Sequence, residues 1–110
     1  MRQLLYDEIS ESDIKKIKRY LTKNAIASPL GDIFWINLPE ELYDETQKSH
    51  KDCQPFYFAI EIGSKYLRIE LLIRSRQRLH CQCIKYANKS QRDFIFDFAD
   101  KLMERLKVRT

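Results

Sequence analysis

The sequence predicts a single α+β domain in which a four-stranded, mostly antiparallel sheet packs with an N-terminal and a C-terminal helix. Three observations predict this class. Apolar residues recur at helical spacing near both ends of the chain, they alternate along four segments between those ends, and three of these segments follow one another as a meander. With 110 residues, of which 44% are hydrophobic, residues 1–110 have the size and the material for one core.

The N-terminal helix is expected to begin after Ser10. Its hydroxyl can accept a hydrogen bond from a free backbone N–H group, and Glu11 and Asp13 lie where the helix dipole favours acids. The core-facing stripe of this helix is Ile14, Ile17 and Leu21. Residues 28–31, Ser-Pro-Leu-Gly, then predict a turn.

The first strand is predicted over residues 32–38, where aromatic and β-branched side chains fill both faces of the sequence DIFWINL. Pro39 and the two glutamates after it are typical of the first turn of a helix. Residues 39–51 therefore predict one or two short helical turns.

The three-strand meander follows Pro55. Residues 56–62 and 66–73 alternate apolar and mostly polar side chains on either side of Gly63-Ser64-Lys65, which predicts a hairpin. Residues 78–87 alternate less regularly and are predicted to form the third strand.

The C-terminal helix is predicted over residues 91–106, with Asn88-Lys89-Ser90 supplying its cap. Its central stripe is Ile95, Phe98, Ala99, Leu102 and Leu106. Phe94, Phe96 and Met103 widen the apolar arc to about 200 degrees, beyond the roughly 100 degrees that a one-sided surface helix needs. We therefore expect this helix to make a second contact.

Composition and motifs exclude several classes of protein. The start of the chain lacks the long apolar stretch of a signal peptide, and no apolar run approaches the roughly 18 residues of a membrane span. Three cysteines cannot all pair within one chain, so a cytoplasmic protein with reduced thiols and no membrane partner is expected. No catalytic or phosphate-binding motif is present, so the sequence predicts neither an enzyme nor a cofactor.

A metal site is the open question raised by the cysteines. The zinc-type donors are His50, Cys53, His80, Cys81 and Cys83. In a regular strand, however, residues i and i+2 lie about 6.6 Å apart, too far for two sulfurs that share one zinc ion. The sequence therefore predicts no metal site and buried cysteines, and it leaves open whether His50, Cys53, Cys81 and Cys83 meet in space.

Positive charge is concentrated in one part of the chain. Residues 65–92 hold eight basic residues and one acid, Glu70, although the whole chain carries a net charge of only +4. Arg74, Arg76 and Arg78 alternate, so an extended backbone would project all three to one side, where guanidinium groups suit carboxylates or phosphates.

The second face of the predicted sheet is too apolar for solvent, which favours a partner surface, although a helix or residues 39–51 could also cover it. We expect a non-catalytic protein-interaction module that binds a protein partner, including a second copy of itself as a homodimer. Nucleic-acid binding, to RNA or a single strand, through the same arginines and exposed tyrosines is the alternative. The predicted binding residues are Trp35, Tyr57, Tyr66, Arg68, Leu72, Arg74, Arg76, Arg78, Ile84 and Tyr86.

Overall fold

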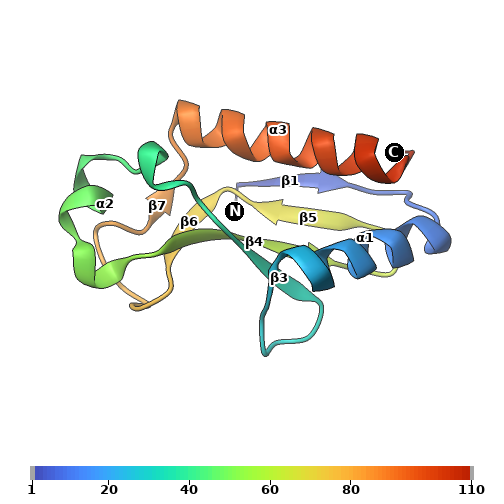
Figure 1. Ribbon diagram of the computed structural model, residues 1–110, viewed down its shortest axis with the longest axis horizontal. Coiled ribbons are helices and arrows are strands. Elements are labelled where there is room, and N and C mark those ends of the chain that lie inside the picture. The colour runs from blue at the N-terminus through green and yellow to red at the C-terminus, as the bar shows by residue number, and fades with distance from the viewer. Residues whose placement is uncertain (1, 110) are drawn as a thin grey trace.

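The computed structural model describes residues 2–109, which form an antiparallel sheet with two long helices over one face (Figure 1). The main strand order is β1-β5-β4-β3-β2, while β6 also pairs with β4 and β7 pairs with β6. Among the helices of this described part, none is long and apolar enough to cross a bilayer. In chain order the elements are β1 (Gln3–Tyr6), α1 (Glu11–Asn24), β2 (Ile26–Ala27), β3 (Ile33–Asn37), the 3-10 turn η1 (Glu40–Leu42), α2 (Glu45–Ser49), the 3-10 turn η2 (Lys51–Cys53), β4 (Phe56–Ile62), β5 (Leu67–Glu70), β6 (Leu72–Ser75), β7 (Lys85–Tyr86) and α3 (Lys89–Leu106).

The α+β class is confirmed, but the sheet has seven strands where the sequence predicts four. Two of the unpredicted strands, β1 and β2, are short and pair with β5 and β3, respectively. Their side chains are exposed or only half-buried. Such edge strands are held by backbone pairing and have little of the burial contrast that makes a strand visible in a sequence.

The single strand predicted over residues 66–73 is two strands, because the pairing with β4 shifts at Leu71. Ile69 of β5 pairs with Ile60 of β4, whereas Arg74 of β6 pairs with Tyr57 of β4. The chain therefore advances five residues from β5 to β6 while the paired positions on β4 advance only three. Such a bulge bends the strand. The backbone of Leu71 instead bonds to the carbonyl of Arg2 and the N–H of Ala87.

The prediction of a strand over residues 78–87 is wrong, since only Lys85 and Tyr86 pair with another strand, as β7. Ser75 explains where the extended chain ends. Its hydroxyl accepts hydrogen bonds from the backbone N–H groups of Gln77 and Arg78, both at 3.0 Å, and so turns the chain away from the sheet. Residues 76–84 form a loop instead.

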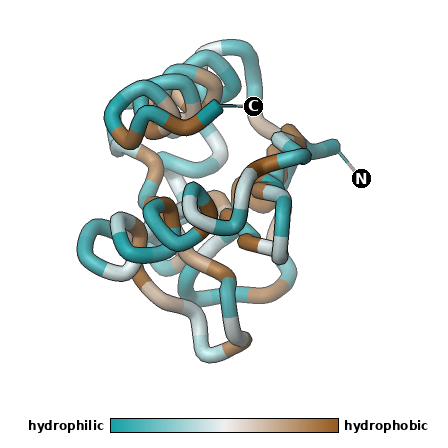
Figure 2. Tube along the Cα trace, turned by 90° about the vertical axis from the view of Figure 1, so that its right-hand side faces the viewer, coloured by the Kyte–Doolittle hydropathy of each residue, from teal (hydrophilic) through white to brown (hydrophobic). Residues whose placement is uncertain are grey.

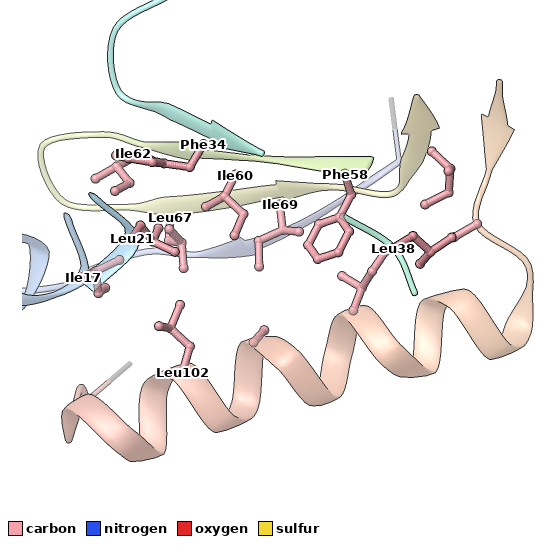
Figure 3. Packing of buried hydrophobic residues seen from close by; sticks show 14 of the residues in the cluster. Ile17, Leu21, Phe34, Leu38, Phe58, Ile60, Ile62, Leu67, Ile69 and Leu102 are labelled. Carbon is pink, nitrogen blue, oxygen red and sulfur yellow. The ribbon is translucent and has the colours of Figure 1, made fainter. Parts of the chain in front are cut away.

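Both predicted long helices are confirmed, together with their caps. Ser10 accepts a hydrogen bond from the N–H of Asp13 at the start of α1, and Asn88 forms a capping box with Gln91 at the start of α3. Hydrophobic and hydrophilic positions alternate along the helical turns (Figure 2). The apolar positions of both helices pack against one face of the sheet (Figure 3), and the labelled core residues are Ile17, Leu21, Phe34, Leu38, Phe58, Ile60, Ile62, Leu67, Ile69 and Leu102.

The wide apolar arc of α3 has two contacts. One edge of the helix presents Phe94 and Phe98, whose rings meet Phe58 of β4 edge-on, with centroids 6.3 Å and 5.8 Å from it. The C-terminal half of the helix lies beside α1, where Arg105 donates a hydrogen bond of 3.2 Å to the hydroxyl of Tyr20. Helix α1 thus supplies a second contact, whereas Phe96, which widens the apolar arc in the sequence, stays 39% exposed.

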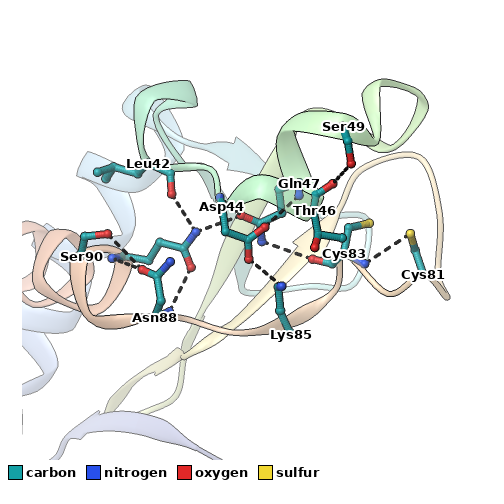
Figure 4. Close-up of polar contacts among 11 residues, drawn as sticks. Leu42, Asp44, Thr46, Gln47, Ser49, Cys81, Cys83, Lys85, Asn88 and Ser90 are labelled. Carbon is teal, nitrogen blue, oxygen red and sulfur yellow. Dashed lines mark hydrogen bonds and ion pairs between the residues drawn. The ribbon is translucent and has the colours of Figure 1, made fainter.

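A buried polar network joins α2, α3 and the loop before β7 (Figure 4). The side chains of Gln47 and Gln91 are fully buried, and each belongs to a capping box. The Gln91 amide donates to Gln47 Oε1 at 2.9 Å, while the Gln47 amide donates to the carbonyl of Cys83 at 3.2 Å. Lys85 of β7 adds an ion pair of 2.7 Å to the N-cap residue Asp44.

This network makes Gln47 a test of the fold. We expect Gln47→Leu to lower the free energy of unfolding by about 1–3 kcal/mol, because the N–H of Asp44 and the carbonyl of Cys83 lose their buried partner. Urea unfolding measures the change. The control Lys48→Gln, on the exposed side of the same helix, should change the free energy of unfolding by about 0.5 kcal/mol or less. Equal urea midpoints for Gln47→Leu and the wild type would contradict the network.

Candidate functional site

The face of the sheet opposite the helices carries the residues that the sequence assigns to a second face. Strand register places Trp35 between Ile26 and Ala59, and places Tyr57 next to Arg74. Residues directly opposite in paired strands share a face. Trp35 is half-buried, so this face is only partly covered.

A shallow cavity of about 470 Å³ lies on this face, and we call it the groove. Its aromatic residues are Trp35 and Tyr57, whose ring centroids are 4.9 Å apart. Tyr57 is 9% exposed, and burial raises the pKa of its phenol. The residues that line the groove are Ser28, Leu30, Ile33, Trp35, Tyr57, Ala59, Glu70, Arg74, Ser75, Arg76, Gln77, Arg78 and Leu79.

The arginines of this face differ in their partners. Arg68 pairs with Glu61 at 2.7 Å, and Arg74 donates two hydrogen bonds to Glu70. Arg76 makes no ion pair within residues 2–109, and its guanidinium lies 4.8 Å from the centroid of the Trp35 ring. Arg78 lies 3.7 Å from Asp52, and both side chains are mostly exposed.

Five of the ten predicted binding residues line the groove, namely Trp35, Tyr57, Arg74, Arg76 and Arg78. The other five lie outside it. Tyr66 has Arg68 over its ring at 5.1 Å, Leu72 pairs with Tyr86 across β6 and β7, and Ile84 packs against the core.

Sequence reasoning missed two apolar residues at the groove. Leu30 and Leu79 are 73% and 87% exposed, and both come from loops. Leu30 was visible as a leucine within the predicted turn at residues 28–31, whereas Leu79 fell in the strand wrongly predicted over residues 78–87. Their position next to Trp35 depends on how the loops fold over the sheet, which no local pattern encodes.

A second cluster lies at the end of the sheet next to α2. Within the described residues, the donor atoms of His50, Cys53, Cys81 and Cys83 all lie within 4.8 Å of one another. Cys81 Sγ is 3.0 Å from His50 Nδ1 and 3.6 Å from Cys53 Sγ. No disulfide links these thiols.

Two short turns bring the four residues of this cluster together. His50 is the C-cap of α2, and Cys53 is the last residue of η2. The N–H of Cys53 donates a hydrogen bond of 3.0 Å to the carbonyl of His50. In the loop before β7, the N–H of Ile84 donates to the carbonyl of Cys81, and the N–H of Cys83 donates to Cys81 Sγ at 3.4 Å.

The chemical state of the thiols differs within the cluster. Hydrogen bonds from the side chain and backbone N–H of Cys83, together with that from His50, lower the pKa of the Cys81 thiol to about 6. Burial raises the pKa of the Cys83 thiol. The Cys81 thiol is therefore more acidic than the Cys83 thiol.

The sequence left open whether these four residues meet, and the structure brings their donor atoms together. The spacing of about 6.6 Å expected for Cys81 and Cys83 in a regular strand does not apply. Residues 81–84 form a turn, and a turn allows i and i+2 side chains to converge. His80, the fifth zinc-type donor in the sequence, is exposed and lies outside the cluster.

Comparisons with known proteins give no family for this chain: no family model, no curated protein and no solved structure matches it.

The stacking of Arg76 on Trp35 generates a prediction, since Trp35 is the only tryptophan of the chain. In Arg76→Ala we expect greater quenching of its fluorescence by acrylamide and a loss of stability of about 0.5–1 kcal/mol, because the guanidinium no longer covers the ring. Gln77→Ala, a neighbouring change in the same loop, is the control. Equal quenching in both variants would show that Arg76 does not cover Trp35.

Proposed function

We propose that this chain is a non-catalytic interaction module that binds an acidic segment of a protein partner in the groove. The observation that carries the proposal is Arg76, which stacks on Trp35 and has no carboxylate partner within the described residues. A cation presented against an aromatic ring in a cavity offers both charge and apolar surface to one ligand.

The charge of the groove supports an acidic ligand. Its lining contains three arginines and one acid, Glu70, which Arg74 already neutralises. Arg76 therefore supplies the positive charge that a ligand carboxylate would meet, and Arg78, whose partner Asp52 is 3.7 Å away and mostly exposed, adds to it. Guanidinium groups bind carboxylates through two parallel hydrogen bonds, which gives a defined orientation as well as attraction.

The apolar part of the groove supports a partner with a hydrophobic anchor. Trp35 and Tyr57 pack against each other, and Leu30 and Leu79 are strongly exposed near them. Aromatic residues and arginine dominate the binding energy of protein interfaces, especially where a central pocket excludes water. An acidic segment with one large apolar side chain fits both features.

A second copy of the chain is the other protein partner that the sequence predicts. In a twofold-symmetric dimer formed through the groove, the groove of one copy would contact the groove of the other. Arg76 and Arg78 would then approach the same arginines of the second copy, and like charges at close range oppose association. Charge therefore favours an acidic partner over self-association through the groove.

Nucleic acid remains the alternative to a protein. Base stacking needs free aromatic faces. Arg68 lies over Tyr66, and Arg2 lies 4.6 Å from the centroid of the Tyr86 ring, while Tyr57 is largely buried. These contacts leave the tyrosines poorly placed for stacking and favour the protein ligand.

Peptide binding tests the proposal directly. Fluorescent peptides with several Asp and Glu residues around one Phe or Leu should bind, whereas matched Asn and Gln peptides should not. We expect Arg76→Glu to weaken binding at least tenfold, since one charged hydrogen bond contributes roughly 1.5–3 kcal/mol and about 1.4 kcal/mol is tenfold. Trp35→Glu should also weaken it, because a carboxylate in the groove repels an acidic ligand. Arg19→Glu, on an exposed position of α1 that does not line the groove, is the folded control.

Two results of that experiment oppose the proposal. Equal binding by wild type and Arg76→Glu would exclude the groove as the site. Binding of a mixed-sequence oligonucleotide that weakens steeply with salt, with no binding of the acidic peptides, would favour nucleic acid instead.

The predicted homodimer has its own test. If the groove is the dimer interface, light scattering should give a mass that rises towards the dimer as NaCl screens the arginines, and Trp35→Glu should restore the monomer. A monomer over the whole range of salt would exclude self-association at the concentrations measured.

A further inference from the structure

We propose that His50, Cys53, Cys81 and Cys83 form a tetrahedral site for a structural Zn²⁺ ion. The inference does not rest on the proposed binding function, because none of the four donor residues lines the groove, although the loop that carries Cys81 and Cys83 also supplies Arg76 and Arg78 to it. It rests on donor type, donor geometry and the hydrogen bonds around the donors.

The donor atoms lie close to the spacing that zinc requires. Zinc bonds of about 2.3 Å to sulfur and about 2.0 Å to nitrogen place neighbouring tetrahedral donors roughly 3.5–3.8 Å apart. Cys81 Sγ lies 3.6 Å from Cys53 Sγ and 3.0 Å from His50 Nδ1. All four donor atoms lie within 4.8 Å of one another. Small rotations of these side chains would suffice to surround an ion.

The donor set selects the metal. Three sulfurs and one imidazole nitrogen are soft and borderline ligands, which suit zinc, whereas calcium and magnesium take oxygen donors. All four tetrahedral positions come from the protein. A closed donor set of this kind is typical of structural zinc and leaves no position open for a substrate.

Hydrogen bonds outside the donor set hold the cluster in place. The N–H of Cys83 points at Cys81 Sγ, and the buried Gln47 amide binds the carbonyl of Cys83 (Figure 4). The hydroxyl of Ser75 donates to the carbonyl of Cys53. Such partners orient the ligands of a metal site and reduce the cost of assembling it.

The charge of the loaded site is small. Three thiolates and one Zn²⁺ leave a single net negative charge. The cavity that His50, Cys53 and Cys81 open into is also lined by Arg78 and Asp52, which lie 3.7 Å apart. Without a metal, three neighbouring thiols have only weak hydrogen bonds to one another.

The metal would add a further attachment to an exposed loop. Residues 76–80 are all exposed. Their contacts with the rest of the protein include backbone bonds to Ser75 and Pro55 and the contacts of Arg76 and Arg78 with Trp35 and Asp52. A zinc ion would tie Cys81 and Cys83 to His50 and Cys53, which lie about thirty residues earlier in the chain. Metal binding that joins distant segments contributes directly to folding stability.

Metal titration of the reduced chain tests the site. We expect one Zn²⁺ per chain, a higher melting temperature with added Zn²⁺ and lower amide exchange in residues 76–84. Co²⁺ should give the strong visible bands of tetrahedral coordination and the charge-transfer absorption of thiolate ligands. His50→Ala and Cys81→Ser should weaken Zn²⁺ binding by more than the roughly 10- to 100-fold caused by loss of a ligand's hydrogen-bond partner.

The chain contains a matched control for these variants. His80 is next to Cys81 but lies outside the cluster, so His80→Ala should bind Zn²⁺ as the wild type does. An equal loss of Zn²⁺ affinity in His80→Ala and His50→Ala would overturn the proposal. So would an octahedral Co²⁺ spectrum, or a reduced, folded chain that fails to bind Zn²⁺ at micromolar concentration.

Discussion

The central strand β4 is the constraint on which the rest of the structure depends. It pairs with β3 along one edge and with β5 and then β6 along the other, and six of its seven residues are buried. Alternate side chains point to opposite faces of a strand. Phe56, Phe58 and Ile60 therefore enter the core below the helices, while Tyr57 and Ala59 lie on the face that carries the groove. One strand thus sets both the core and the candidate binding surface.

The bulge at Leu71 links this strand to both candidate sites. It turns the chain so that β6 pairs with the first part of β4 and ends at Ser75. From there the loop supplies Arg76 and Arg78 to the groove and the two cysteines to the cluster near α2. The groove and the thiol cluster are therefore neighbours through one loop, although they have different chemistry.

The buried glutamines show how polar groups can organise a core of this size. Gln47 and Gln91 complete the caps of two helices and bond to each other, so their amides are satisfied without water. Because the Gln47 amide also reaches Cys83, the start of α3 and the turn at residues 81–84 are fixed relative to each other. Fully satisfied networks of this kind give the surrounding structure one defined arrangement.

Sequence by itself determined the parts of this protein that depend on local chemistry. Ser10 and Asn88 start the helices, alternation over residues 56–62 marks the central strand, and Trp35 and Tyr57 share the second face because of strand parity. Tertiary structure alone decided that Arg74 is neutralised by Glu70 while Arg76 stacks on Trp35. It also decided that two cysteines in a turn meet His50 and Cys53. These outcomes depend on which distant segments come into contact, and the periodicity of a sequence carries no information about such contacts.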